Sequence, residues 1–203
     1  MAAPLDPRVT RARIVDAAMT LFAERGFDGV STRDLGRRAA CNIATLNYHF
    51  GGKQKLYEAV VDEVYRRMRT ELAATILPAG PAIGRARLRV LVARFYAALR
   101  REREGVRLIL REVLDRGRLA PGLEQAHVLG NLDEADAAFA VLLGTTRERA
   151  RKALVAASFL ASRYVIHDDE ALARSLGVAS VADAHDAAIE TLTDALAAWL
   201  EPG

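Results

Sequence analysis

The chain has 203 residues, which is enough for one domain of ordinary size or two small ones. Apolar residues make up 51% of it and charged residues 27%, a balance that excludes disordered and collagen-like chains. The net charge is only +3, but residues 1–118 carry 23 Lys and Arg against 13 Asp and Glu, whereas residues 119–203 carry 6 against 13. The basic N-terminal part is compatible with a polyanionic partner.

The pattern of apolar residues predicts an all-α fold, because no segment alternates apolar and polar residues as a strand does. The first helix is predicted around residues 14–22, where apolar side chains recur at the spacing of one helix face. Asp6 with Pro7, or alternatively Thr10, would cap its start. Gly26 would end it.

Two short helices joined by a tight turn are predicted next. Ser31 is the expected N-cap of the first, and Asp34 three residues later forms a capping box with it. The second spans about residues 43–50 and ends at Gly51 and Gly52. The side chains expected to face inward from these two helices are Leu35, Ala39, Ile43, Leu46 and Phe50.

Longer helices are predicted for the rest of the chain, which is rich in good helix formers. They are expected at residues 53–77, at 88–99, after Gly105 at 106–114, and at 124–143, 146–166 and 182–200, with a short helix at 169–176. Segments 78–81 and 116–122 are expected to be loops, because Pro and Gly interrupt them.

A longer helix followed by two short ones is the pattern of a helix-turn-helix DNA reader. The outer positions of the predicted 43–50 helix favour this interpretation, because a helix that enters the major groove needs short or hydrogen-bonding side chains. An ordinary solvent-exposed face is the alternative. These outer positions are Ala44, Thr45, Asn47, Tyr48 and His49.

Two stretches of sequence carry a family resemblance. Residues 25–35, RGFDGVSTRDL, resemble the join between the first two helices of TetR-type transcriptional regulators. Residues 42–57, NIATLNYHFGGKQKLY, are similar to the recognition helix of that family and the start of its fourth helix, and their first nine residues are similar to the CecR-like subgroup. The resemblance implies a helix-turn-helix DNA-binding domain at 8–68, with its recognition motif at about 31–50, and a helical ligand-binding and dimerisation domain at 69–203.

The resemblance also implies which residues touch DNA. Lys53 would contact phosphate through its backbone amide at a helix N-terminus. Arg33, like Arg37, would either reach a flanking phosphate or remain solvated. The residues expected on the phosphate backbone are Thr32, Arg33, Tyr48, His49 and Lys53. The residues expected to face base edges are Ala44, Thr45 and Asn47.

The C-terminal helices of this family bind a small molecule and form a homodimer, and the same is expected here. Small residues in the last two long helices would allow close packing in a four-helix bundle of two subunits, with an intramolecular core as the alternative. The expected interface residues are Ala157, Ala161, Leu192, Leu196 and Trp199. The expected pocket residues are Met68, Phe95, Tyr96, Ile109, Phe139, Phe159 and Tyr164. Arg107 and Glu112 could either orient a ligand or form a surface ion pair, and the ion pair is the favoured interpretation.

Other function classes find little support in the sequence. No phosphate-binding Gly-rich loop, nucleophile triad or zinc pattern is present, so neither enzyme activity nor a cofactor or metal is expected. The lone Cys41 replaces a glycine common in this turn, so the turn is either strained or slightly different. The thiol is interpreted as a half-buried small residue, with redox sensing as the alternative. The chain has no signal-peptide pattern and no membrane-length apolar run, which predicts a cytoplasmic protein. The alternatives to a repressor are a TetR-type activator and a helical adaptor that binds only protein.

Overall fold

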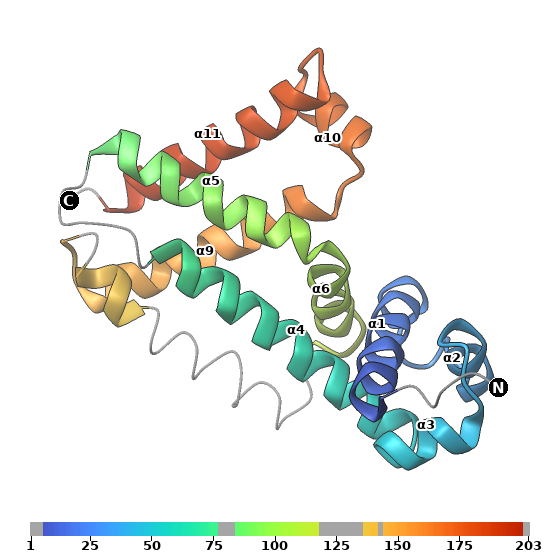
Figure 1. Cartoon of the computed structure of the whole chain (residues 1–203). Coiled ribbons are helices and arrows are strands. Elements are labelled where there is room, and N and C mark those ends of the chain that lie inside the picture. Colours follow the sequence, from blue (N-terminus) through green and yellow to red (C-terminus); the bar gives the residue numbers. More distant parts are fainter. Residues whose placement is uncertain (1–5, 77–83, 118–135, 142–143, 201–203) are drawn as a thin grey trace. The chain divides into compact units, whose positions relative to one another are not determined.

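The computed structural model describes residues 6–76, 84–117, 136–141 and 144–200, and none of these residues lies in a strand (Figure 1). Residues 136–141 are helical. The all-α prediction is therefore confirmed for the described part of the chain. Its main helices are α1 (Pro7–Arg25), α2 (Thr32–Arg38), α3 (Ile43–Phe50), α4 (Lys53–Ile76), α5 (Arg85–Arg101), α6 (Arg103–Arg116), α9 (Arg147–Ile166), α10 (Asp169–Leu176) and α11 (Val181–Leu200).

The chain divides into two compact units. The N-terminal unit comprises residues 1–66 and 104–124, and the C-terminal unit comprises residues 67–103 and 125–203. Helix α4 runs from one unit into the other, and α6 belongs with the N-terminal unit although it follows α5 in sequence. The predicted domain boundary at residue 68 stays a prediction.

Local signals place the first helices. Asp6 caps α1 by accepting a hydrogen bond from the Arg8 amide at 2.8 Å, and Pro7 occupies the first turn, where no amide donor is needed. Gly26 ends α1 with a positive φ of 72°. Of the two alternatives for the N-cap, the structure selects Asp6, while Thr10 lies inside the helix and is buried.

The core of the N-terminal unit is built from apolar faces of α1, α2, α3, α4 and α6. Leu35 and Ala39 of the second predicted helix are buried as expected, and so are Leu46 and Phe50 of the third. The prediction for Ile43 is wrong, because its side chain is 40% exposed at the first position of α3. The largest side chains that are less than 2% exposed in this unit are Ile14, Phe22, Val30, Leu35, Leu46, Leu56, Tyr57, Val60 and Leu108.

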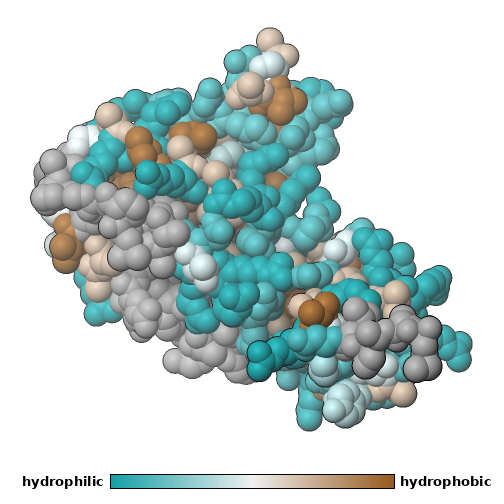
Figure 2. All heavy atoms as spheres, in the orientation of Figure 1, coloured by the Kyte–Doolittle hydropathy of each residue, from teal (hydrophilic) through white to brown (hydrophobic). Residues whose placement is uncertain are grey.

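The C-terminal unit has α11 at its centre, packed against α5, α9 and α10. Thr146 and Asp168 cap α9 and α10 by accepting hydrogen bonds from backbone amides three residues later. Arg85 of α5 forms ion pairs with Glu190 and Asp194 of α11, and these side chains are exposed to solvent. In the view of Figure 2 the described surface is mostly hydrophilic, with separate hydrophobic spots.

Helix boundaries in the middle of the chain differ from the prediction. Gly105 was expected to precede a helix, but α6 begins at Arg103 and Glu102 alone separates it from α5. The expected helix at 169–176 has those bounds. Segments 78–81 and 118–122 and most of the expected helix at 124–143 lie outside the described residues.

Candidate nucleic-acid interface

The two caps of the predicted recognition motif are formed by side chains. The Ser31 hydroxyl accepts from the Asp34 amide at 3.1 Å, and the Asp34 carboxylate accepts from the Ser31 amide at 3.1 Å, which completes the predicted capping box. The Ser31 hydroxyl also donates to the Asp34 carboxylate at 2.5 Å, and this bond, together with the one from the Ser31 amide, lowers the pKa of Asp34, with a further contribution from Arg37. Asn42 caps α3 by accepting from the Thr45 amide at 2.7 Å. Both short helices thus start at positions that the sequence itself specifies.

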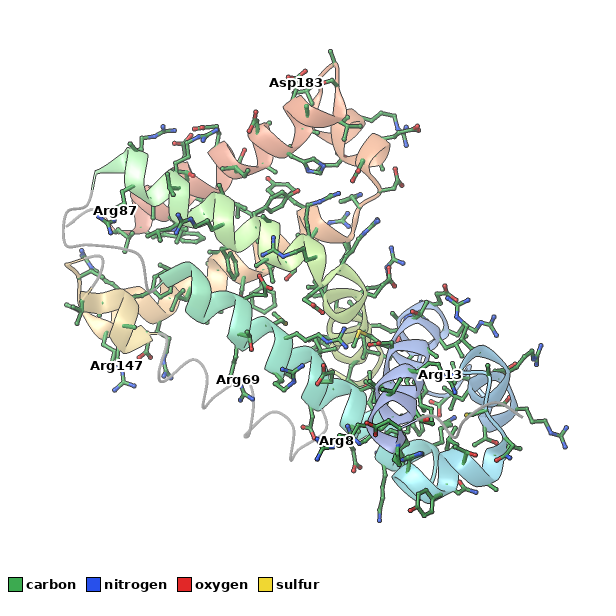
Figure 3. The ribbon with its side chains drawn as sticks, in the orientation of Figure 1. Arg8, Arg13, Arg69, Arg87, Arg147 and Asp183 are labelled. Atoms are coloured by element: carbon green, nitrogen blue, oxygen red, sulfur yellow. The ribbon has the colours of Figure 1, made fainter. Side chains whose placement is uncertain are left out.

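The turn between α2 and α3 avoids strain at Cys41. The residue with a positive φ is Ala40, at 47°, and the Cys41 amide donates to the Gly36 carbonyl at 2.9 Å. A Cβ on Gly36 would lie 2.8 Å from the Cys41 carbonyl oxygen, so the close approach explains the glycine. Burial raises the pKa of the Cys41 thiol, against a smaller lowering by Arg13, which extends from α1 (Figure 3). A raised pKa disfavours the thiolate that redox sensing needs.

Helix α3 presents a polar outer face. Leu46 and Phe50 point into the core, whereas Ala44 and Asn47 are exposed and the Tyr48 side chain is 84% exposed. Thr45 and His49 are half-buried at the edges of this face. The Thr45 hydroxyl donates to Asn42 at 2.9 Å, so its remaining capacity toward DNA is as an acceptor. Asn47 keeps an exposed amide that can both donate and accept.

The predicted phosphate contacts fall into two groups. Thr32 and Arg33 open α2, where Arg33 is exposed and Thr32 is half-buried. Lys53 opens α4, but its ammonium turns back into the protein. It donates to the Val30 carbonyl at 2.9 Å and lies 4.1 Å from the centre of the Phe27 ring. This leaves the backbone amide of Lys53 as the group expected to face a phosphate.

The predicted pocket residues belong to both units, and the pocket that they would form stays a prediction. Six belong to the C-terminal unit, but Ile109 belongs to the N-terminal unit. Tyr96 is buried and its hydroxyl lies 3.1 Å from Nδ1 of His185, while Phe159 is 65% exposed. A surface hollow in the C-terminal unit is lined instead by Asp136, Arg147, Glu148 and Arg151. Its position near Arg147 at the start of α9 can be found in Figure 3.

The predicted interface residues divide by burial. Ala157, Ala161 and Leu192 are at most 6% exposed in the single chain, where α9 packs against α11. Leu196 is half-buried and Trp199 is 44% exposed. Of the five residues, therefore, the last two retain surface that a second subunit could cover.

The structure corrects the predicted ion pair between two residues of the N-terminal unit. Glu112 is only 5% exposed and accepts a hydrogen bond from the hydroxyl of Tyr57 at 2.5 Å, so it does not form a surface ion pair with Arg107. Arg107 pairs instead with Glu104, with 3.6 Å between their charged atoms. A signal for Glu112 was present, because it lies four residues after the buried Leu108 on the same helix face.

Neither a metal centre nor a membrane segment is found in the part of the chain that the structure describes. These residues contain no group of three or more metal-ligating side chains. Their helices also include none that is both long and apolar enough to span a bilayer.

Comparisons with known proteins agree with this geometry. Residues 14–60 match the family model of bacterial regulatory proteins, tetR family. The chain is 39% identical over 56 residues to the probable HTH-type transcriptional regulator YttP of Bacillus subtilis (strain 168), which is 28% of this chain and 27% of that protein. It is 41% identical over 49 residues to IcaR of Staphylococcus aureus (strain Newman), the negative transcriptional regulator of the biofilm operon icaADBC, which is 24% of this chain and 26% of that protein.

The chain thus matches only about a quarter of the length of these curated relatives. Over a larger part, it is similar to the crystal structure of a TetR-like transcriptional regulator from Rhodococcus sp. RHA1. That match has a TM-score of 0.67 and 20% identity, and it covers 95% of this chain and 96% of the other. The fold is accordingly that of TetR-like regulators, with a helix-turn-helix domain followed by a helical C-terminal domain.

Proposed function

We propose that this TetR-family chain is a transcriptional regulator that reads a double-stranded DNA operator with α3, most simply as a dimeric repressor in the cytoplasm. The observation that carries the proposal is the outer face of α3, where Ala44, Asn47 and Tyr48 are exposed above a buried inner face. A helix with short and amide side chains outward fits the major groove and meets acceptors and donors on base edges. The name of IcaR, a negative regulator, favours repression over activation.

A helical adaptor is less well supported. Such a protein needs a contiguous exposed apolar patch. On the face shown in Figure 2 the hydrophobic side chains of the described residues are scattered. A TetR-type activator would use the same DNA-reading face, so only the direction of the transcriptional response distinguishes it from a repressor.

We also propose that the C-terminal unit binds a small-molecule effector and forms the dimer. For the effector, the support is the family together with a mixed apolar and polar interior around Tyr96 and His185. The effector would favour a state in which the two recognition helices no longer match successive major grooves, about 34–36 Å apart. Membership of the CecR-like subgroup rests chiefly on the similarity of residues 42–50, and the comparisons with known proteins do not support it.

The proposal is tested at Asn47. Selection of binding sites from a random duplex library supplies the operator, and Asn47→Ala should then weaken operator binding by roughly 1–3 kcal/mol while leaving binding to random DNA almost unchanged. Both affinities are measured by fluorescence anisotropy at several salt concentrations, since phosphate contacts make them salt-dependent.

Gln54→Ala is the matched control, because it removes another exposed side-chain amide, one that donates to Glu58 on its own helix at 3.0 Å. The control should keep the preference for the operator. An equal loss by Asn47→Ala on both DNAs would make Asn47 a backbone contact, and failure of the wild-type protein to select any sequence would contradict the proposed function.

A further inference from the structure

We propose that the buried hydrogen bond between Tyr57 and Glu112 positions the recognition helix, which makes α6 a working part of the DNA-reading unit. This inference rests on the proposed function. The two residues are 55 positions apart in sequence, and the Tyr57 hydroxyl donates to Oε2 of Glu112 at 2.5 Å. Tyr57 is 1% exposed and Glu112 is 5% exposed. A carboxylate this deeply buried is stable only where hydrogen bonds offset its lost hydration.

Helix α6 is fitted closely to the rest of the N-terminal unit along its length. A Cβ on Gly105 would lie 2.8 Å from Val64 of α4, so the two helices approach at a distance that only glycine allows. Farther along, atoms of Arg111 and Asp115 lie 3.5 Å from where a Cβ on Gly26 would be, beside the end of α1. Glu112 is placed between these two contacts on the helix, where its carboxylate reaches Tyr57.

Tyr57 lies in the second turn of α4, close to the end of α3. Its ring packs edge-on against Phe22 and Phe27, with centroids 5.0 and 5.1 Å apart. Lys53, one turn earlier, is tied to the Val30 carbonyl and the Phe27 ring. The beginning of α4 is therefore held by α1, by the segment before α2 and, through the Tyr57 hydroxyl, by α6.

The position of α3 depends on this anchored start of α4. Only Gly51 and Gly52 separate Phe50, the last residue of α3, from α4. Helix α3 has eight residues and too small a buried face, with Leu46 and Phe50, to fix its own orientation. A shift of the first turns of α4 is therefore passed to α3, and base contacts tolerate little displacement because their hydrogen bonds are directional. Tyr57 and Glu112 are positioning residues in this sense, and neither touches DNA.

The test removes one buried hydroxyl group from each of the two units. Tyr57→Phe keeps the ring in the aromatic cluster and loses the hydroxyl. Thr193→Val is the matched control, because Thr193 is 0% exposed and its hydroxyl donates to the Ile189 carbonyl at 2.7 Å, but in the C-terminal unit. Operator and random-DNA affinities are measured for both full-length variants well below their melting temperatures.

We expect Tyr57→Phe to weaken operator binding about tenfold, the equivalent of one charged hydrogen bond, with little change on random DNA and an unchanged salt slope. Amide NMR shifts of residues 43–50 should move in Tyr57→Phe, although no ring has been removed, and stay in place in Thr193→Val. Thr193→Val should keep wild-type operator affinity even if its melting temperature falls.

A second pair of variants separates positioning from general destabilisation. Glu112→Gln retains an oxygen that can accept from Tyr57 and should bind the operator more tightly than Glu112→Ala does. In the double variant Tyr57→Phe/Glu112→Ala the losses should be less than additive, because both substitutions remove the hydrogen bond that joins the two residues. Wild-type affinity and unmoved α3 amides in Tyr57→Phe would overturn the inference while leaving DNA binding intact. A wild-type protein that selects no sequence would overturn the proposed function itself.

Discussion

Lys53 illustrates how a side chain assigned to DNA takes part in folding instead. Family resemblance places this residue on a phosphate, and a lysine ammonium would normally supply the contact. Here the ammonium donates to the Val30 carbonyl and covers the Phe27 ring, so it joins the start of α4 to the segment before α2. The amide at the helix start remains the group that faces outward, and helix N-termini bind phosphate through such amides.

Replacing Lys53 by Met should therefore lower the free energy of unfolding but leave the salt dependence of DNA binding unchanged. We expect a loss of about 1–3 kcal/mol in the free energy of unfolding, from one charged hydrogen bond and one cation–π contact. The salt slope of operator binding should stay the same, whereas loss of an ammonium–phosphate contact would reduce it by about one.

Urea unfolding and a salt titration measure the two effects. Lys152→Met is the control, because Lys152 forms an exposed pair with Glu148 on its own helix and such pairs contribute little. If Lys53→Met lowers the salt slope and keeps full stability, the ammonium contacts DNA after all.

At the scale of the helices, Gly105 is the residue at which the packing of α6 against α4 is closest to a steric limit. Glycine inside a helix ordinarily costs stability, and alanine there would be better by about 1 kcal/mol on propensity alone. The Val64 methyl groups, however, would lie 2.8 and 3.0 Å from the added Cβ. Valine has little freedom at χ1 to move them away.

Gly105→Ala should accordingly destabilise the chain by about 1–2 kcal/mol net, since overpacking outweighs the propensity gain. The same substitution in a Val64→Ala background should be neutral or stabilising, because the clash has been removed. Urea unfolding of the four proteins gives the coupling free energy of this cycle. Additive effects of the two substitutions would mean that α6 can move away from α4 without cost.

The sequence predicts those elements whose ends are specified locally. Ser31, Asp34 and Asn42 form their capping contacts with residues three positions away, so α2 and α3 could be placed from composition and spacing. The break between α5 and α6 could not, because Glu102 carries no breaker signal and Gly105 carries a misleading one. That glycine is required by Val64, a neighbour 41 positions away in sequence.

The same distinction applies to the candidate site. The outer face of α3 follows from helical periodicity, and its exposed residues lie where the sequence indicated. Glu112 was misread because an acidic residue on a helix is usually solvated, and only the fold brings Tyr57 to it. The pocket residues stay a prediction, because a large apolar side chain at helical spacing does not reveal which helix it faces.

For the whole molecule, the proposed dimer depends on surface that remains open on α9 and α11. Phe159 is 65% exposed and Trp199 is 44% exposed, whereas the small residues expected at the interface are buried within the chain. Aromatic side chains contribute strongly to protein interfaces, and exposed ones carry a cost in water. Phe159 and Trp199 are thus the positions at which a dimer through these helices is best tested.

Phe159→Glu and Trp199→Glu should each shift the protein from dimer to monomer, because a carboxylate would be buried without a partner in the interface. Light scattering coupled to size-exclusion chromatography measures the mass. Val90→Glu on α5 is the control, since Val90 is 48% exposed and lies outside both helices. Dimeric mass in both aromatic variants, or loss of it in the control, would move the interface elsewhere.

The grouping of α6 with the N-terminal unit sets a rule for recombining such proteins. A chimera that exchanged only residues 1–68 for those of a relative would replace Tyr57 and Val64 but retain Glu112 and Gly105, which are shaped to them. The boundary between donor and recipient sequence would then cut through the packing of α4 against α6 instead of separating two independent domains. A transplant of DNA specificity should therefore carry residues 103–116 along with the helix-turn-helix. The recipient's residues 67–102, 36 in number, would then lie between Arg66, where the first segment of the N-terminal unit ends, and Arg103, where α6 begins.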